Sequence, residues 1–287
     1  MQVLTSVAAI GGITFVLTSL LVLANRKLHV EEDPRIDLVE AMLPNFNCGG
    51  CGLPGCRPFA EALIQGTVLP GKCNVSTDEG RLAIASFLGV DVGKEAKRVA
   101  RLACAGGANV ARNRAKYAGL GTCQAAALVA GGGKACFWGC LGLADCAVAC
   151  TFDAIRMDPH GLPVVSEAKC TACGDCVDAC PKDLFSIHEA SHRLWVACRS
   201  QEAGDEILED CEVGCTACGR CAADAPGLIE MIGNLPVVDY TRRHETRVPI
   251  ERCPTGAIVW LDAEKGPIKG AAAKKVIRKG ALRDLPT

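Results

Sequence analysis

Residues 134–155 read KACFWGCLGLADCAVACTFDAI, and residues 162–185 read LPVVSEAKCTACGDCVDACPKDLF. The second segment spaces its four cysteines as C-x2-C-x2-C-x3-C and places Pro181 directly after the last one. The first segment spaces its four cysteines more loosely, as C-x3-C-x5-C-x3-C. Three closely spaced thiols with a more distant Cys-Pro are typical of iron–sulfur ligation, whereas zinc ribbons take two ligands from each of two knuckles.

The second segment has the ligand run of bacterial two-cluster ferredoxins, in which the fourth cysteine ligates the other cluster. With this crossover the two segments together predict two [4Fe–4S] sites. The predicted ligands are Cys136, Cys140, Cys146 and Cys180 at one site, and Cys150, Cys170, Cys173 and Cys176 at the other.

The composition indicates a protein held together by metal ligation. The chain has 287 residues, enough for about two domains, and it has 20 cysteines but only 4% aromatic residues. Metal–thiolate bonds supply folding energy where large apolar side chains are scarce. Disulfides are the rival interpretation, but closely spaced C-x2-C runs favour a metal in a reducing compartment. A net charge of −1 disfavours nucleic-acid binding, which needs a basic face.

The amino-terminal segment predicts a membrane anchor. Residues 3–24 carry no charged side chain, and a membrane-spanning helix needs about 20 residues. Arg26 and Lys27 follow directly, so the positive-inside rule places the rest of the chain in the cytoplasm. A cleaved signal peptide is the alternative, but the basic residues that should precede its apolar part are missing. We expect a single-pass anchor over residues 1–25 and a linker over residues 26–34.

A third cysteine group follows the linker, within NCGGCGLPGC and a later PGKC. The glycines between these cysteines allow backbone amides to approach a cluster and donate to its sulfurs. A zinc knuckle is the alternative for this ligand type. Ser76-x-x-Glu79 predicts a capping box that opens a helix through Leu88, and the small domain should span residues 35–93. The predicted ligands of its single [4Fe–4S] cluster are Cys48, Cys51, Cys56 and Cys73.

The chain also contains an internal repeat. LPVV occurs at 162–165 and again at 235–238, and this register places Cys180-Pro181 opposite Cys253-Pro254. A second ungapped block aligns CFWGCLGLADCAVAC with CEVGCTACGRCAADA, so that Cys136 lies opposite Cys211. Residues 136–192 should therefore form a two-cluster ferredoxin domain, and residues 193–262 a second, degenerate unit.

The second unit has lost one ligand set as a whole. The positions of Cys150, Cys170, Cys173 and Cys176 are taken by Ala225, Arg243, Thr246 and Pro249. Loss of one complete set is what the crossover rule predicts when a single cluster survives. The predicted ligands of that cluster are Cys215, Cys218, Cys221 and Cys253.

Four cysteines remain unassigned: Cys104, Cys123, Cys198 and Cys211. Cys104 and Cys198 have similar contexts, RLAC and WVAC, and each should end a strand. Free cysteine often serves as a small buried hydrophobe, and the alternative is a fifth cluster that joins the two repeats. Four clusters are therefore expected, and five if these cysteines form a site. The segment 94–135 is predicted to be a connection, and its Gly131–Gly133 run a turn because the phosphate-loop frame is absent.

The N-terminal helix, the stretch EDPRIDLVEAMLPNFNCGGCGLPGCRPFAEAL and the ferredoxin-like units resemble, in this order, the B-type subunit of the Rnf complex. Rnf is a membrane-bound ion-translocating ferredoxin:NAD+ oxidoreductase. The KAC-x2-GCLG-x3-C-x3-C version of the first ferredoxin half resembles the clostridial-type branch. Two departures are Thr151, where a Pro is usual, and the single complete ligand set of the second unit. The resemblance covers nearly the whole chain except the last 25 residues.

The resemblance implies an α+β electron-transfer subunit of a translocase that accepts electrons from soluble ferredoxin and passes them to membrane partner subunits. No residue is expected to act as acid, base or nucleophile, because the clusters carry the chemistry. No dinucleotide fingerprint follows a strand, so NAD should bind to another subunit. The alternatives are the input subunit of another membrane reductase and a zinc-stabilised membrane-tethered adaptor.

Two further features have no assigned role in this chemistry. Five scattered histidines are expected at the surface: His29, His160, His188, His192 and His244. Residues 263–287 form a basic tail, and from Lys265 onward it has seven Lys or Arg against one acidic residue, Asp284. This tail could bind anionic lipid or an acidic ferredoxin, or be a solvated tail.

Overall fold

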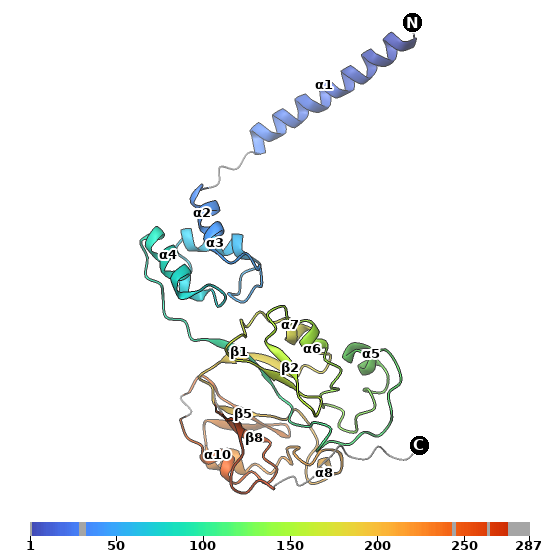
Figure 1. Ribbon diagram of the computed structural model, residues 1–287, viewed down its shortest axis with the longest axis vertical. Helices are drawn as coiled ribbons and strands as arrows, with labels where there is room; N and C mark the ends of the chain where they lie inside the picture. Colours follow the sequence, from blue (N-terminus) through green and yellow to red (C-terminus); the bar gives the residue numbers. More distant parts are fainter. Residues whose placement is uncertain (1, 29–32, 243–244, 263–264, 275–287) are drawn as a thin grey trace.

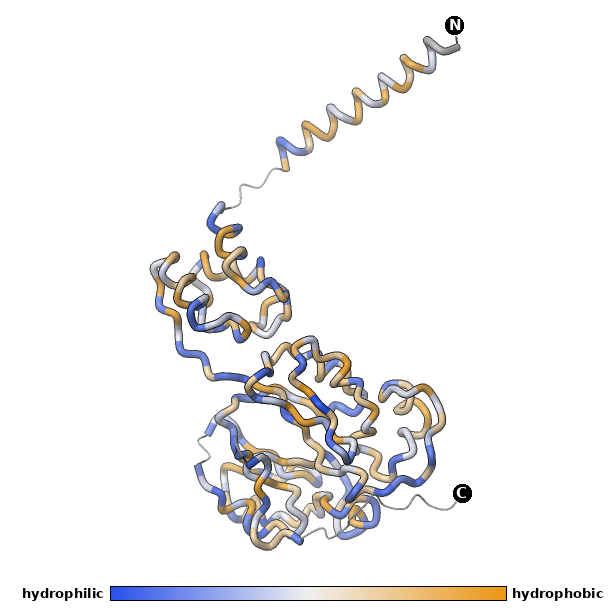
Figure 2. The backbone as a smooth tube through the Cα atoms, in the orientation of Figure 1, coloured by the Kyte–Doolittle hydropathy of each residue, from blue (hydrophilic) through white to orange (hydrophobic). Residues whose placement is uncertain are grey.

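The computed structural model describes residues 2–28, 33–242, 245–262 and 265–274. Helix α1 (Gln2–Leu28) stands apart from the remainder of the protein (Figure 1). Among the described residues it is the one helix long and apolar enough to cross a membrane, over Thr5–Leu28, and none of that segment is buried against protein. Hydrophobic residues recur along most of this helix, and hydrophilic residues stand at its end nearest the small domain (Figure 2), as expected for a helix that lipid surrounds.

The small domain that follows is helical, and it packs around one apolar core. Its elements are α2 (Arg35–Met42), α3 (Cys56–Ile64), the 3-10 turn η1 (Pro70–Lys72) and α4 (Asp78–Leu88). Val39, Phe59 and Ile84 are almost fully buried where α2, α3 and α4 meet. The N-cap of α4 is Thr77, whose hydroxyl accepts from the Gly80 amide at 3.1 Å, and not Ser76 as the capping box predicted. The helix ends at Gly89 in the left-handed conformation, as expected.

The first ferredoxin unit is two antiparallel strand pairs with two short helices. Strand β1 (Arg98–Leu102) pairs with β4 (Phe185–Glu189), and β2 (Ile155–Met157) pairs with β3 (Pro163–Val165). Helices α6 (Asp145–Val148) and α7 (Asp175–Asp178) each carry one buried cysteine. The segment predicted as a connection over 94–135 is an integral part of this unit, because it supplies β1 and also α5 (Cys123–Leu128).

The second unit repeats this plan. Strand β5 (Leu194–Val196) pairs with β8 (Ile258–Asp262), which also pairs with β9 (Gly266–Ile268), and β6 (Ile229–Ile232) pairs with β7 (Leu235–Val238). Its helices are α8 (Ile207–Asp210), α9 (Arg220–Asp224) and α10 (Val248–Glu251). Helices α7 and α10, and strands β4 and β8, have equivalent bounds in the LPVV register. The repeat inferred from the sequence is therefore present in the backbone.

Apolar packing replaces the lost cluster of the second unit. Ala225 and Ile250 are buried in a core with Ile229, Val238 and Ile258. Pro249, the counterpart of Cys176, is among the most fully buried residues. Thr246 is exposed, and Arg243 lies outside the described residues.

The two units are joined edge to edge at the ends of β1 and β5. The indole N–H of Trp195 donates to the Leu102 carbonyl at 2.8 Å, and the Ala105 amide donates to the Ala197 carbonyl at 3.0 Å. Further along, residues 110–112 exchange backbone hydrogen bonds with residues 210–212. The cysteine-bearing segments after β1 and β5 therefore lie side by side.

Candidate iron–sulfur centres

The 20 cysteines form five groups of four, and each group lines its own cavity. All 20 are free thiols. The groups are site 1 (Cys48, Cys51, Cys56, Cys73), site 2 (Cys123, Cys140, Cys146, Cys180), site 3 (Cys150, Cys170, Cys173, Cys176), site 4 (Cys215, Cys218, Cys221, Cys253) and site 5 (Cys104, Cys136, Cys198, Cys211).

In each group the thiols surround a volume and do not converge on a point. Among the described residues, no three Cys, His, Asp or Glu side chains come close enough to share one metal ion. Tetrahedral zinc would draw four sulfurs to about 2.3 Å from a single centre. A four-iron cluster is bound by four thiolates at separate irons, and this donor set around a cavity fits such a cluster.

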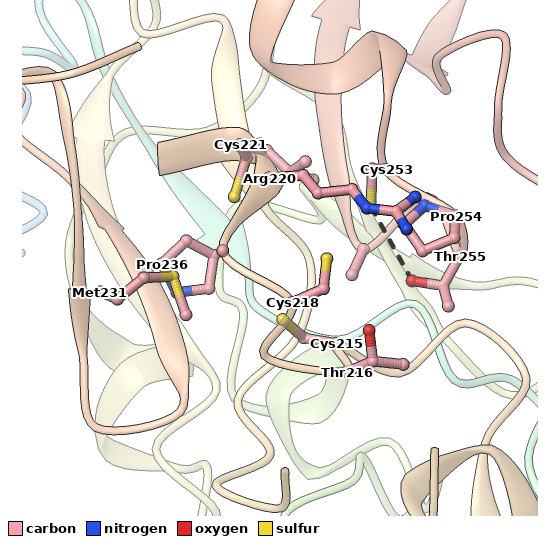
Figure 3. A pocket seen from close by; sticks show the side chains of 13 residues that line it. Cys215, Thr216, Cys218, Arg220, Cys221, Met231, Pro236, Cys253, Pro254 and Thr255 are labelled. Carbon is pink, nitrogen blue, oxygen red and sulfur yellow. Dashed lines mark hydrogen bonds between the residues drawn. The ribbon is translucent and has the colours of Figure 1, made fainter. Parts of the chain in front are cut away.

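Site 4 illustrates this geometry. Figure 3 shows the four sulfur atoms around the cavity, three of them on the loop and helix at 215–221 and the fourth on Cys253. Cys218 is exposed, whereas Cys215 and Cys221 are buried. The Thr255 hydroxyl and the Cys253 thiol lie 3.9 Å apart. The grouping is the one that the repeat predicted for the surviving ligand set.

Sites 1 and 3 also contain the cysteines that the spacing predicted. In site 1 the Ser76 hydroxyl donates to the Cys73 sulfur at 3.2 Å, which gives a role to the residue that does not cap α4. In site 3 the Ala154 amide donates to the Cys150 sulfur at 3.3 Å, and the Ala100 amide donates to the Cys170 sulfur at 3.4 Å. Backbone donors of this kind stabilise thiolate charge at a cluster.

Site 2 differs from its predicted ligand set in one member. Cys136 does not line this cavity, and Cys123 lines it instead. Hydrogen bonds at the start of α5 place Cys123 in this position. There the Asp145 carboxylate accepts from the amides of Cys123 and Gln124 at 2.9 and 3.0 Å. These two hydrogen bonds hold Cys123 against α6, which carries Cys146.

Cys136 lies in site 5, with three of the four cysteines that the sequence left unassigned. Cys104 and Cys198 lie two residues beyond β1 and β5, so neither ends a strand as expected, and Cys211 follows α8. They line a common cavity, and Cys211 is also part of an apolar core with Val110 and Val213.

The repeat contains the signal for this regrouping. In the register that places Cys140 opposite Cys215, the counterpart of Cys218 is Leu143, so site 2 lacks one local ligand. Cys123 stands in its place. The same register places Cys136 opposite Cys211, and these two cysteines share site 5.

The loops share one hydrogen-bond pattern, in which the amide two residues after a cysteine donates to its sulfur. It occurs at Cys48, Cys140, Cys173 and Cys215, once in each of sites 1 to 4. Ala172 and Ala217 have φ of 59° and 54° in the two C-T-A-C loops. This left-handed conformation costs energy for alanine and is typical of functional sites.

Burial dominates the acid–base behaviour of the thiols. Burial first, and nearby thiols second, raise the pKa of Cys146 and Cys221 to about 11 and that of Cys176 and Cys215 to about 12. A cluster ligand must be a thiolate. Deprotonation of four neighbouring buried thiols therefore requires the positive charge of bound iron.

The remaining sequence predictions near the sites have mixed outcomes. Gly131–Gly133 form a turn, as expected, with φ of 80° to 86°. His160 is exposed, whereas His188 and His192 are half-buried and pack against Tyr240, at 4.8 and 4.6 Å between ring centroids. His29 and His244 lie outside the described residues.

Comparison with known proteins agrees with the cysteine chemistry. A family model described as a putative Fe-S cluster matches residues 43–75, and one described as a 4Fe-4S binding domain matches residues 163–185. The B-type subunit of the Na(+)-translocating ferredoxin:NAD(+) oxidoreductase complex of Acetobacterium woodii is 36% identical, over 89% of this chain and 77% of the relative. The B-type subunit of the ion-translocating oxidoreductase complex of Methanosarcina acetivorans is 34% identical, over 89% of this chain and 97% of the relative. This chain belongs to the family of B-type subunits of ion-translocating oxidoreductase complexes.

A third member of the family is the B-type subunit of the proton-translocating ferredoxin:NAD(+) oxidoreductase complex of Clostridium ljungdahlii, which is 38% identical over 88% of this chain and 89% of the relative. Membership confirms the resemblance found in the sequence, including its clostridial-type character. The chain is thus an iron–sulfur subunit of a multi-subunit oxidoreductase complex, with one apolar helix that associates it with the membrane.

Proposed function

We propose that this subunit relays electrons between soluble ferredoxin and the membrane-embedded subunits of its complex. The ligand sets of its relay clusters are those of sites 1 to 4. Each bound cluster takes up and releases one electron, while the protein positions it, excludes water from it and donates hydrogen bonds to its sulfurs.

The observation that supports a relay is that sites 1, 3 and 2 adjoin one another. The Asn74 side chain, next to Cys73, donates to the Thr171 carbonyl of the site 3 loop at 3.2 Å. Cys176 of site 3 and Cys146 of site 2 are buried in a common apolar core. An electron can therefore pass from one group to the next without leaving the protein.

Site 4 is the proposed docking point for ferredoxin. Cys218 is exposed, and the exposed Arg220 lines the same cavity. Arg252 lies near Cys218 and pairs with Asp224 at 2.6 Å. Positive charge around an exposed ligand favours a fast encounter with an acidic partner. Site 1 belongs to the domain next to the anchor and lies at the opposite end of the relay (Figure 1).

Several finer assignments belong to the same proposal. Arg26 and Lys27 at the end of α1 favour placement of the cluster domains on the cytoplasmic side. Nicotinamide chemistry is assigned to another subunit, since no G-x-G-x-x-G run follows a strand among the described residues. The small domain is kept at residues 35–93, the two-cluster unit is extended to begin at β1, and the second unit, predicted to end at residue 262, is extended to include β9. Of the basic tail, residues 263–264 and 275–287 lie outside the described residues.

The test is reduction of the anaerobically purified protein by chemically reduced ferredoxin. The reaction is monitored through the bleaching of the cluster absorption near 400 nm and through EPR. The relay predicts complete bleaching, and Arg220→Glu should slow the bimolecular phase most at low salt. Arg156→Glu, the same charge reversal at an exposed position of β2 in the first unit, is the matched control. A colourless zinc protein would contradict the proposal. So would a reduction rate that changes neither with salt concentration nor in Arg220→Glu.

A further inference from the structure

We infer that Cys104, Cys136, Cys198 and Cys211 bind a fifth [4Fe–4S] cluster, which joins the two ferredoxin units into one continuous relay. This inference rests on the proposed function, since it adds a member to the same relay. No contiguous cysteine motif encodes this site, because its four ligands come from four separate segments of the chain.

The backbone around site 5 is built in the same way as around the other sites. All four sulfurs accept from the amide two residues further on: Cys104 from Gly106 at 3.4 Å, Cys198 from Ser200 at 3.5 Å, and Cys136 and Cys211 from Trp138 and Val213. The other four sites each contain this arrangement. Buried thiols that served only as small hydrophobes would not need a dedicated amide donor each.

Gly106 fixes how closely the backbone approaches this cavity. A Cβ at this position would lie 3.1 Å from the Cys211 sulfur and 3.7 Å from the Cys104 sulfur. The backbone here therefore borders directly on the volume that the cluster would occupy, as glycine permits.

The charge around site 5 suits an anionic thiolate cluster. Lys134 and Arg199 both line the cavity. The Lys134 ammonium is held by the carbonyls of Gly106 and Cys140, at 2.6 Å from the latter. A half-buried cation fixed between site 5 and site 2 offsets the negative charge that four thiolates introduce.

The ligands come in equivalent pairs from the two units. Cys136 and Cys211 align in the repeat, and Cys104 and Cys198 occupy the same place after β1 and β5. Each unit thus contributes half of the ligand set. The contact between residues 110–112 and 210–212 closes the two halves around the cavity.

Site 5 also supplies the missing connection of the relay. The Cys140 amide of site 2 donates to the Cys104 sulfur at 3.4 Å, and the Cys215 amide of site 4 donates to the Cys198 sulfur at 3.3 Å. The order of sites by direct contact is therefore 1, 3, 2, 5, 4. This order differs from the order of the cysteines along the chain.

Iron and acid-labile sulfide analysis of the complete, anaerobically purified chain tests the inference. We expect about 20 iron atoms per chain, at four for each cluster, and about 16 in Cys211→Ala. The double variant Cys104→Ala/Cys211→Ala should also hold about 16, because both residues serve one cluster. Cys211→Ala/Cys218→Ala should hold about 12, because these serve two clusters.

A wild-type chain with about 16 iron atoms, unchanged in Cys211→Ala, would overturn the inference and leave the four-site relay intact. A chain without iron would overturn both. If Cys211→Ala fails to fold, Gly106→Val provides a second test that keeps all thiols, and it should lose about four iron atoms while Gly121→Val, at an open loop position, loses none. Retention of all iron in Gly106→Val would count against the site.

Discussion

Asp145→Ala should release Cys123 from site 2 without removing any thiol. The Asp145 carboxylate accepts two backbone hydrogen bonds at the start of α5, at 2.9 and 3.0 Å. A hydrogen bond to a charged group contributes about 1.5 to 3 kcal/mol, so the two together hold α5 with about 3 kcal/mol at the lower end. Their loss should raise the population of detached α5 roughly 100-fold, at 1.4 kcal/mol per factor of ten.

The assay is anaerobic iron release to a ferrous chelator, which reports how often a cluster becomes accessible. One phase, with an amplitude of about four iron atoms, should accelerate by up to roughly 100-fold in Asp145→Ala. Asp145→Asn keeps one acceptor oxygen and should give an intermediate rate. Asp178→Ala, an exposed carboxylate on α7, is the matched control and should leave every phase unchanged. Identical release kinetics in Asp145→Ala would refute Cys123 as the fourth ligand of site 2 and return that role to Cys136.

Four other perturbations follow from the same geometry. Lys134→Met should make the adjoining clusters harder to reduce, because it removes the cation between sites 2 and 5. An EPR-monitored redox titration should show a lower midpoint potential at unchanged iron content. An unchanged midpoint potential would show that Lys134 does not offset the charge of these clusters. Ile250→Ala, at a residue 1% exposed, should destabilise the second unit by about 2 to 5 kcal/mol; anaerobic denaturation followed by tryptophan fluorescence checks this against the exposed Val248→Ala. Deletion of residues 1–28 should yield a soluble protein with full iron content, because α1 buries none of its span against protein; loss of iron or continued pelleting with membranes would contradict this. Ser76→Ala should lower the potential of the site 1 cluster, because the sulfur of Cys73 loses a hydroxyl donor at 3.2 Å, and Ser86→Ala on the outer part of α4 should not.

The parts of the protein that local spacing encodes could be predicted from the sequence. The ligand groups of sites 1, 3 and 4 each contain a C-x2-C step, which brings thiols together through one short loop, and the structure groups the same cysteines. The α+β class with an amino-terminal apolar helix was likewise predictable, because apolar patterning and cluster motifs are local signals. The bounds of the repeat followed from two ungapped alignments.

The non-local parts could not be predicted from spacing. Cys123 reaches site 2 through side-chain capping by Asp145, which lies 22 residues away. Cys104 and Cys198 meet only because β1 and β5 end side by side, as a result of strand pairing and the Trp195 hydrogen bond to Leu102. The alignment did show that Leu143 stands where Cys218 stands in the second unit, so a count of cysteines per site would have indicated that Cys136 need not line the same cavity as Cys140.

The divided ligand set of site 5 has a consequence for how the protein is made. Each unit contributes two of the four thiols, so this centre can be filled only after both units have folded and are in contact. Insertion of this iron would then act as a checkpoint during biogenesis. In the proposed relay, a chain interrupted after the first unit would have three complete sites, an open pair of thiols at its edge, and no connection to site 4, the proposed docking point for ferredoxin.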